Sequence, residues 1–147
     1  MTRRQVPTMP NEISHDAARA AVQAALTDAI ARKFSNALPI HGHGDTLPGW
    51  TAKPGHCHAQ VECWLQAHPG DTAVRGWITD ICFDDSIRWA AHSLVRTAAG
   101  ALLDVPFSTP SYVHHFIGHP AAAGDFFALV LGEPPLPYVV VPLPDRS

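Results

Sequence analysis

"TAVRGWITDICF" (72–83) and "SIRWAAHSLVRTA" (86–98) decide the fold predicted for this chain. Both segments are rich in Val, Ile, Trp and Thr, which are favoured in strands, and the Asp84-Asp85 turn joins them. "ALLDVPF" (101–107) follows the short connection "AAG", which ends at Gly100, and predicts a third strand. The centre of the chain therefore predicts successive antiparallel strands.

Two helices are expected before these strands. The segment "SHDAARAAVQAALTDAIARKF" (14–34) repeats apolar residues at helical spacing, and Ser14 is suited to cap its start. The second helix is expected from Cys57 to His68, where Pro69-Gly70 ends it. Helices followed by an antiparallel sheet predict an α+β fold, with the second helix packed on the sheet.

Less regular segments surround these elements. Residues 1–12 are polar and predict a loose N-terminal arm, and 36–56 holds four glycines and three prolines and predicts a Gly/Pro/His-rich loop. Residues 110–137 are compatible with a loop and a short helix around 125–131. "PYVVVPLP" (137–144) predicts an edge strand because prolines bracket it. The length of 147 residues predicts a single domain over 1–147.

Composition restricts the possible partners. Hydrophobic residues make up 46% of the chain and charged residues 16%, which is typical of a globular protein. The net charge is -3 and no basic block exceeds Arg3-Arg4, so we expect no nucleic-acid partner. No apolar run approaches ~18 residues, so no membrane span is expected. No apolar stretch follows the twin arginine Arg3-Arg4, so no signal peptide is expected. The odd count of three cysteines favours free thiols in a reducing cytoplasm.

Cys57 is the strongest candidate for chemistry. It opens the helix in "PGHCHAQVECWLQAHPG" (54–70), and it shares one apolar face with Val61, Trp64 and Leu65 at helical spacing. At a helix start, unpaired N–H groups and the helix dipole stabilise an anion and so lower the pKa of a thiol. The alternative is an ordinary buried cysteine. Cys63 and Cys82 are expected to be inert.

A nucleophilic thiol needs a base and a group that orients the base. His92 and Asp104 lie on successive predicted strands, and the loop between the strands decides whether they meet. A five-residue loop over 96–100 places them directly opposite, and a three-residue loop ending at Gly100 places them diagonally on one face. An even-length loop places them on opposite faces. A glycine in the left-handed position favours the odd lengths.

The order Cys57, His92, Asp104 resembles the papain-like cysteine enzymes in their transglutaminase-like and NlpC/P60-like branches. The resemblance covers roughly residues 50–107. It implies a papain-like core in which Cys57 is the nucleophile, His92 the base and Asp104 the orienting carboxylate. The segments "GHCHAQVECW", "AAHSLVRTAAGALLDV" and "FIGHP" are also similar to small uncharacterised bacterial proteins with a Cys-His-x-Asn-Val segment. This chain has Gln60 at the position of that asparagine.

The chain departs from these families near the predicted thiol. Leu94 stands where transglutaminase-like sequences usually carry tryptophan. Papain relatives place an oxyanion-hole glutamine shortly before the cysteine, where this chain has Trp50, Thr51 and Lys53. The Cys57 N–H supplies one candidate donor, and the side chains of His58 and Gln60 are candidates for the second. Trp50 is expected on the rim of the cleft.

The remaining histidines permit other interpretations. His41, His43, Asp45 and His119 could hold zinc or iron, which would make the chain a non-catalytic metal-binding or interaction protein. His119 is also a candidate second acid/base or substrate contact, or simply a turn residue before Pro120. A papain-like fold kept only as a binding module is a third interpretation.

We therefore predict a cysteine-dependent hydrolase or acyltransferase that acts on an amide, ester or thioester carbonyl. No cofactor is needed for this chemistry. A chain of 147 residues with one glycine-rich loop leaves little room for an extended peptide groove. We expect the substrate to be a small molecule or a short peptide tail.

Overall fold

The computed structural model describes residues 10–53, 56–106, 114–132 and 134–143. The helices are α1 (Pro10–Lys33), α2 (Cys57–Ala67) and α3 (Phe126–Val130), with short 3-10 helices η1 (Phe34–Asn36), η2 (Gly44–Thr46) and η3 (Ala121–Ala123). The strands are β1 (Leu38–Pro39), β2 (Gly42–His43), β3 (Thr72–Cys82), β4 (Ser86–Arg96), β5 (Leu102–Asp104), β6 (His115–Gly118) and β7 (Tyr138–Pro142). The predicted α+β class is confirmed.

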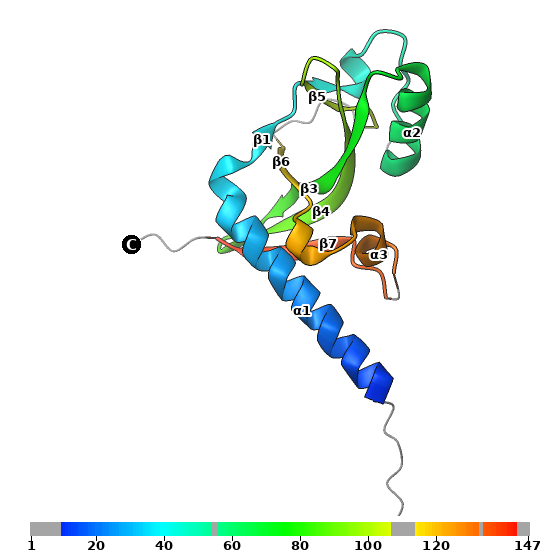
Figure 1. Cartoon of the computed structure of the whole chain (residues 1–147). Helices are drawn as coiled ribbons and strands as arrows, with labels where there is room; N and C mark the ends of the chain where they lie inside the picture. Colours follow the sequence, from blue (N-terminus) through cyan, green and yellow to red (C-terminus); the bar gives the residue numbers. More distant parts are fainter. Residues whose placement is uncertain (1–9, 54–55, 107–113, 133, 144–147) are drawn as a thin grey trace, which may run out of the picture.

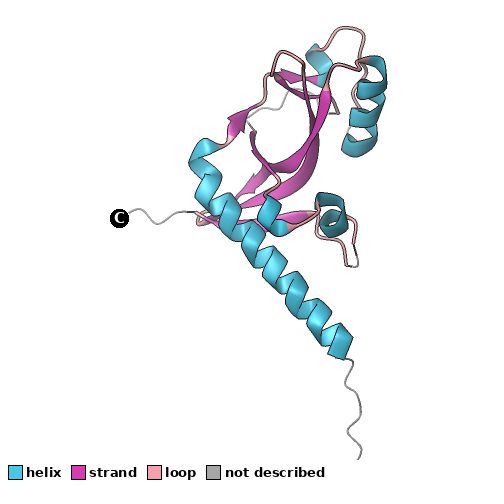
Figure 2. Ribbon diagram, viewed as in Figure 1, coloured by secondary structure: helices cyan, strands magenta, loops and turns pink. Residues whose placement is uncertain are grey.

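The strands form one curled sheet, shown in magenta in Figure 2. Its order is β1-β6-β3-β4-β5-β2, and β7 pairs with β4. All pairs are antiparallel except β2 with β5, which run parallel. The β3–β4 hairpin is the longest pair and extends from Thr72↔Arg96 to Cys82↔Ile87, with a register shift between Thr79 and Ile81.

The edge of β4 that faces away from β3 pairs with two short strands. β7 pairs with Ser86–Ala90, and β5 pairs with Val95 and Arg96. In the described part of the chain, residues 91–94 therefore have a strand partner on the β3 side only. We call this gap the β4 window. Neighbouring N–H groups of a strand point in opposite directions, so the N–H of Ser93 faces the window like that of Ala91, which bonds the carbonyl of Pro137 at 2.9 Å.

Helices cover one face of the sheet at two places (Figure 1). At one end α1 and α3 pack on the sheet, and this core is formed by buried residues that include Leu26, Ile30, Trp77, Trp89 and Phe126. At the other end α2 buries Val61 and Trp64 against Val95 and Val105. The other face of the sheet buries Ile78, Leu94, Leu102 and Phe116. The predicted packing of the second helix on the sheet is confirmed.

Several predicted boundaries differ from the structure. α1 begins at Pro10, so Ser14 lies inside the helix and the prediction that Ser14 caps it is wrong. Proline suits the first position of a helix because it has no N–H that would be left unpaired. Of the predicted arm, residues 10–12 are helical and 1–9 lie outside the described residues. The predicted loop 36–56 contains β1, β2 and η2.

The C-terminal third contains one strand that the sequence did not predict. β6 pairs with both β1 and β3 and lies near the start of 110–137, the segment expected to be loop and helix. The expected short helix is α3, capped by Asp125, whose carboxylate accepts the N–H of Ala128 at 2.8 Å. The predicted edge strand is β7, and β4 is its only strand partner among the described residues. None of the described helices combines the length and apolar character that crossing a membrane requires.

Candidate active site

The β4–β5 hairpin brings His92 and Asp104 together. The strands pair Val95 with Leu103, and the Thr97 N–H bonds the Ala101 carbonyl at 2.9 Å, which leaves a three-residue loop ending at Gly100. Gly100 has φ +95°, the left-handed conformation expected there. This register is the one predicted for a three-residue loop, with His92 and Asp104 placed diagonally on one face. His92 Nε2 lies 2.8 Å from Asp104 Oδ1, and the two residues are 3% and 0% exposed.

The protonation of this pair follows from its chemistry. An ionised carboxylate can only accept, so His92 Nε2 donates to Asp104. The other ring nitrogen, Nδ1, is then the one available to exchange a proton with a neighbouring group. Burial lowers the pKa of His92, but the hydrogen bonds and charges of Asp104 and Cys57 raise it more, to about 9.

Cys57 occupies the first position of α2. The first hydrogen bond of the helix runs from the Gln60 N–H to the His56 carbonyl at 2.8 Å, so the N–H groups of residues 57–59 have no acceptor within the helix. The loop before α2 is fixed by Trp50, whose indole N–H donates to the Val105 carbonyl at 2.7 Å and whose ring lies 5.1 Å from that of Trp64. Trp50 therefore links α2 to the segment that follows β5.

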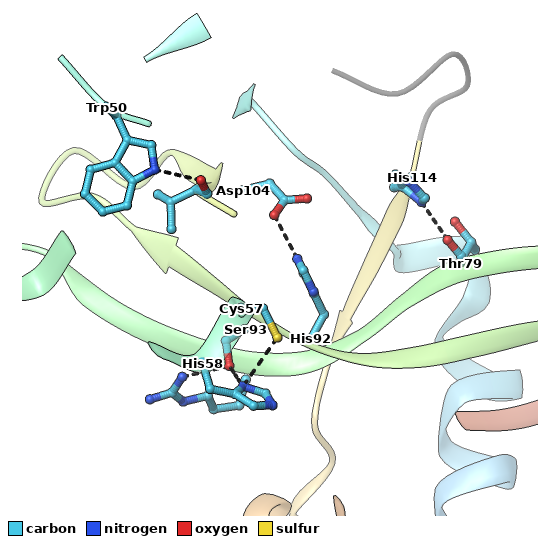
Figure 3. A network of polar contacts seen from close by, with 10 residues as sticks. Trp50, Cys57, His58, Thr79, His92, Ser93, Asp104 and His114 are labelled. Atoms are coloured by element: carbon cyan, nitrogen blue, oxygen red, sulfur yellow. Dashed lines mark hydrogen bonds and ion pairs between the residues drawn. The ribbon is translucent and has the colours of Figure 1, made fainter. Parts of the chain in front are cut away.

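The thiol of Cys57 meets β4 at the β4 window. It accepts a hydrogen bond from the backbone N–H of Ser93 and interacts with the side chain of His92. Figure 3 shows the sulfur beside these two neighbouring residues of the strand. Burial raises the pKa of Cys57, but hydrogen bonds from His58, His92 and Ser93 and the charge of His92 lower it to about 5. Between these pKa values of about 5 and 9, Cys57 and His92 form a thiolate–imidazolium pair.

A second histidine also touches the thiol. His58 Nδ1 lies 3.6 Å from Cys57 Sγ and 2.5 Å from Ser93 Oγ (Figure 3). Arg75 Nη1 donates to the same Ser93 oxygen at 2.7 Å, and Arg75 Nη2 binds Glu62 at 2.6 Å. Asp104 orients the His92 ring, whereas the His58 ring is bonded to the Ser93 hydroxyl, which carries no charge. This geometry makes His92 the stronger candidate for the base and His58 a candidate hydrogen-bond donor to the thiol.

Ser93 and Arg75 were not recognised from the sequence. The Arg75 side chain is 19% exposed, and its guanidinium lies 4.9 Å from the centre of the Phe127 ring. Ser93 follows His92 directly, and strand alternation places neighbouring side chains on opposite faces. No pattern in the sequence therefore indicates that both residues reach one thiol.

The other candidate donors lie elsewhere or are differently engaged. Gln60 is buried, and its Oε1 has no partner among the described residues. His119 lies in the turn after β6, where Nδ1 accepts from the Trp77 indole at 3.0 Å and Nε2 donates to the Gly124 carbonyl at 2.9 Å. Burial lowers the pKa of His119, although Gly124 and Asp125 oppose the shift. These contacts fit the interpretation of His119 as a turn residue.

The set His41, His43, Asp45 and His119 is not gathered by the fold. His41 Nδ1 accepts the Leu102 N–H at 2.9 Å, whereas His119 bonds Trp77 and Gly124. The described residues contain no group of three or more His, Cys, Asp or Glu side chains that could hold a metal ion. Cys63 and Cys82 are exposed free thiols.

Comparison of the chain with protein-family models, with curated proteins and with solved structures gives no match. The functional interpretation therefore depends on the residues and their geometry. Those residues are a thiol at a helix start, a carboxylate-bound imidazole beside it, and a main-chain donor from β4.

Proposed function

We propose that the protein is a cysteine-dependent hydrolase or acyltransferase of papain-like, transglutaminase-related architecture. The observation that carries the proposal is the contact of Cys57 with His92, whose other ring nitrogen is bound by the buried Asp104. A carboxylate-backed imidazole beside a thiol at a helix N-terminus is the arrangement that nucleophilic cysteine chemistry requires. The pKa of about 5 keeps Cys57 ionised at neutral pH.

The reaction begins with attack of the Cys57 thiolate on the carbonyl carbon of an amide, ester or thioester. A C–S bond forms and the carbonyl electrons move to oxygen. When the tetrahedral intermediate collapses, the leaving group departs with the proton of the His92 imidazolium, and an acyl-thioester remains on Cys57. Asp104 holds the His92 ring in place and stabilises its charged form.

The second half of the reaction regenerates the thiolate. Neutral His92 takes a proton from an incoming water molecule, whose oxygen attacks the acyl-thioester, and the C–S bond breaks to release the acid. An amine in place of water gives acyl transfer through the same steps. The oxyanion faces the N–H groups at the start of α2 that have no acceptor within the helix, among them that of Cys57. This main-chain site replaces the glutamine that is missing before Cys57.

The substrate we propose is a small molecule or a short, flexible peptide tail. Cys57 is only partly exposed, and the neighbouring His58 ring is flanked by the rings of Phe126 and Phe127 at 5.8 and 5.1 Å. A narrow acyl group reaches such a thiol more easily than a folded chain does. We also propose a reducing, cytoplasmic setting, which the three free cysteines support.

The test is acyl-enzyme formation with a panel of activated acyl donors, comprising a nitrophenyl ester, an acyl thioester and an anilide. Intact mass spectrometry is expected to show one added acyl group, located on Cys57, and a burst of leaving group of equal size. Cys63→Ala is the matched control and is expected to behave like the native chain. Turnover that persists in Cys57→Ala, with the fold intact by circular dichroism, would sink the proposal.

A further inference from the structure

The carboxylate of Asp104 uses only one of its two oxygens for His92. Oδ1 is bound to His92 Nε2, whereas Oδ2 is buried and has no hydrogen-bond partner among the described residues. The residue as a whole is 0% exposed. A buried carboxylate oxygen without a donor destabilises the ionised form, which the proposed chemistry needs.

A donor of the right kind sits on the neighbouring strand. β2 pairs in parallel with β5, and the register places His43 beside Asp104. Side chains of paired residues in parallel strands point to the same face of the sheet. His43 Nε2 is also buried and also lacks a partner among the described residues. The pairing thus places a potential N–H donor and a carboxylate acceptor, both unpaired and both buried, on adjacent residues.

The backbone of this segment is held firmly enough to keep the two side chains adjacent. The His41 N–H donates to the Leu102 carbonyl at 2.8 Å, and the His41 ring accepts the Leu102 N–H. On the other side, the Thr46 hydroxyl donates to the His43 carbonyl at 2.7 Å.

We propose that His43 is a positioning residue of the same site: its Nε2–H donates to Asp104 Oδ2 while Oδ1 accepts from His92. This inference rests on the proposed function. The two donors fix the plane of the carboxylate and keep it ionised, so that it continues to orient the His92 ring. The titratable groups that the structure places around this carboxylate are His92 on β4, by its hydrogen bond, His43 on β2, by register, and Cys57 on α2, which contacts His92.

The test is the pH dependence of Cys57 alkylation by iodoacetamide in His43→Leu, His43→Gln and His41→Ala. Leucine fills the space without a donor, so Asp104 orients the His92 ring less well and the acid limb of the Cys57 profile moves up by about 0.5–1 pH unit. Because a more basic thiolate is also more nucleophilic, the reaction on that limb is expected to slow by about 2- to 4-fold. Glutamine restores an N–H near the position of Nε2 and is expected to restore the native profile. His41→Ala weakens the same loop without reaching Asp104, and its profile is expected to match the native one.

A native profile in His43→Leu overturns the inference, as does an equal shift in His41→Ala, because the shift would then come from the loop. If His43→Leu fails to fold, His43→Met, which also fills the space without a donor, is compared with His43→Gln: a shift in the methionine variant alone supports the donor role, and native profiles in both variants contradict it. Failure of the proposed function looks different, because Cys57 would keep its low pKa and its response to His43→Leu yet form no acyl-enzyme. A native Cys57 with an ordinary thiol pKa overturns both.

Discussion

Replacement of His92 by alanine is expected to slow the alkylation of Cys57 at acid pH and to accelerate it at alkaline pH. The substitution removes the positive charge and the hydrogen bond that His92 gives to the thiolate. The pKa of Cys57 then rises from about 5 toward its ordinary value of 9.0. A rise in pKa lowers the thiolate fraction, but it also makes each thiolate more nucleophilic.

The two effects can be compared in the limit of a complete return to 9.0. At pH 6 the ionised fraction falls from about 90% to about 0.1%, a loss of roughly 900-fold. With a Brønsted coefficient of about 0.45, four pKa units raise the reactivity of the thiolate about 60-fold. The variant is therefore expected to react about 15-fold more slowly at pH 6 and about 30-fold faster at pH 9, with equal rates near pH 7.

The assay is iodoacetamide labelling from pH 4.5 to 9.5, with Cys57, Cys63 and Cys82 followed separately by peptide mass spectrometry. Cys63 and Cys82 are exposed and serve as internal controls in the same molecule. Their profiles are expected to be the same in the native chain and in His92→Ala. A general loosening of the fold would change all three thiols and would not produce rates that cross.

Two results would refute this reasoning. The first is a native Cys57 profile that coincides with those of the exposed cysteines, which would mean that no thiolate–imidazolium pair exists. The second is a His92→Ala profile that overlays the native one, which would assign the low pKa to Ser93 and His58 instead. A uniform decrease at every pH, without crossing, would indicate a steric effect on the reagent.

Two further substitutions test the support of the pair. Asp104→Asn keeps the shape of the side chain but removes the charge that holds the proton on His92. We therefore expect the alkylation profile of Cys57 to move toward higher pH. We also expect the free energy of unfolding, measured by urea titration, to fall by about 1–3 kcal/mol. Gly76 lies opposite His92, and a Cβ there would stand 2.3 Å from the Ile117 carbonyl and 2.6 Å from the Phe116 ring. Gly76→Ala is therefore expected to lower the free energy of unfolding by about 1–3 kcal/mol. Gly118→Ala is the control: a Cβ there meets nothing within 4 Å, so the loss is expected to be less than half as large. Equal losses would contradict the packing described.

Local rules were sufficient for the parts of the site that depend on one element or one turn. Helical spacing places Cys57 on the buried face of α2 with Val61 and Trp64. The glycine at the end of "AAG" favours an odd-length hairpin loop, and either odd length places His92 and Asp104 on one face; the structure has the three-residue loop. These relations follow from backbone periodicity and need no knowledge of the rest of the chain.

Contacts that depend on where strands end could not be predicted from the sequence in the same way. The β4 window exists because β7 stops at Ala90 and β5 starts at Val95, and these limits are set by tertiary packing. Strands of two to four residues, such as β2 and β6, are too short to show a period. For this reason Gly42 and His43 were predicted as part of a loop, although they form β2 beside Leu103 and Asp104.

The approach of the thiol through the edge of β4 explains how two neighbouring residues of one strand act on it. His92 contributes its side chain, and Ser93 contributes a main-chain N–H that points into the window. A thiol above either face of the sheet would meet only one of the two side chains. The third donor, His58, comes from α2 itself and is held by the Ser93 hydroxyl.

These three sources predict graded effects on Cys57. In the thiolate form His58 Nδ1 carries a proton, because a ring nitrogen lone pair facing a thiolate 3.6 Å away would be repelled. His58→Ala is therefore expected to raise the pKa of Cys57, but by less than His92→Ala, since His58 adds a hydrogen bond without the charge that His92 carries. Ser93→Ala is the matched control: it frees the His58 ring but keeps the main-chain N–H, so its shift is expected to be no larger than that of His58→Ala. A larger shift in Ser93→Ala than in His92→Ala, measured by the same alkylation profiles, would show that the hydroxyl network, and not the carboxylate-backed histidine, maintains the thiolate.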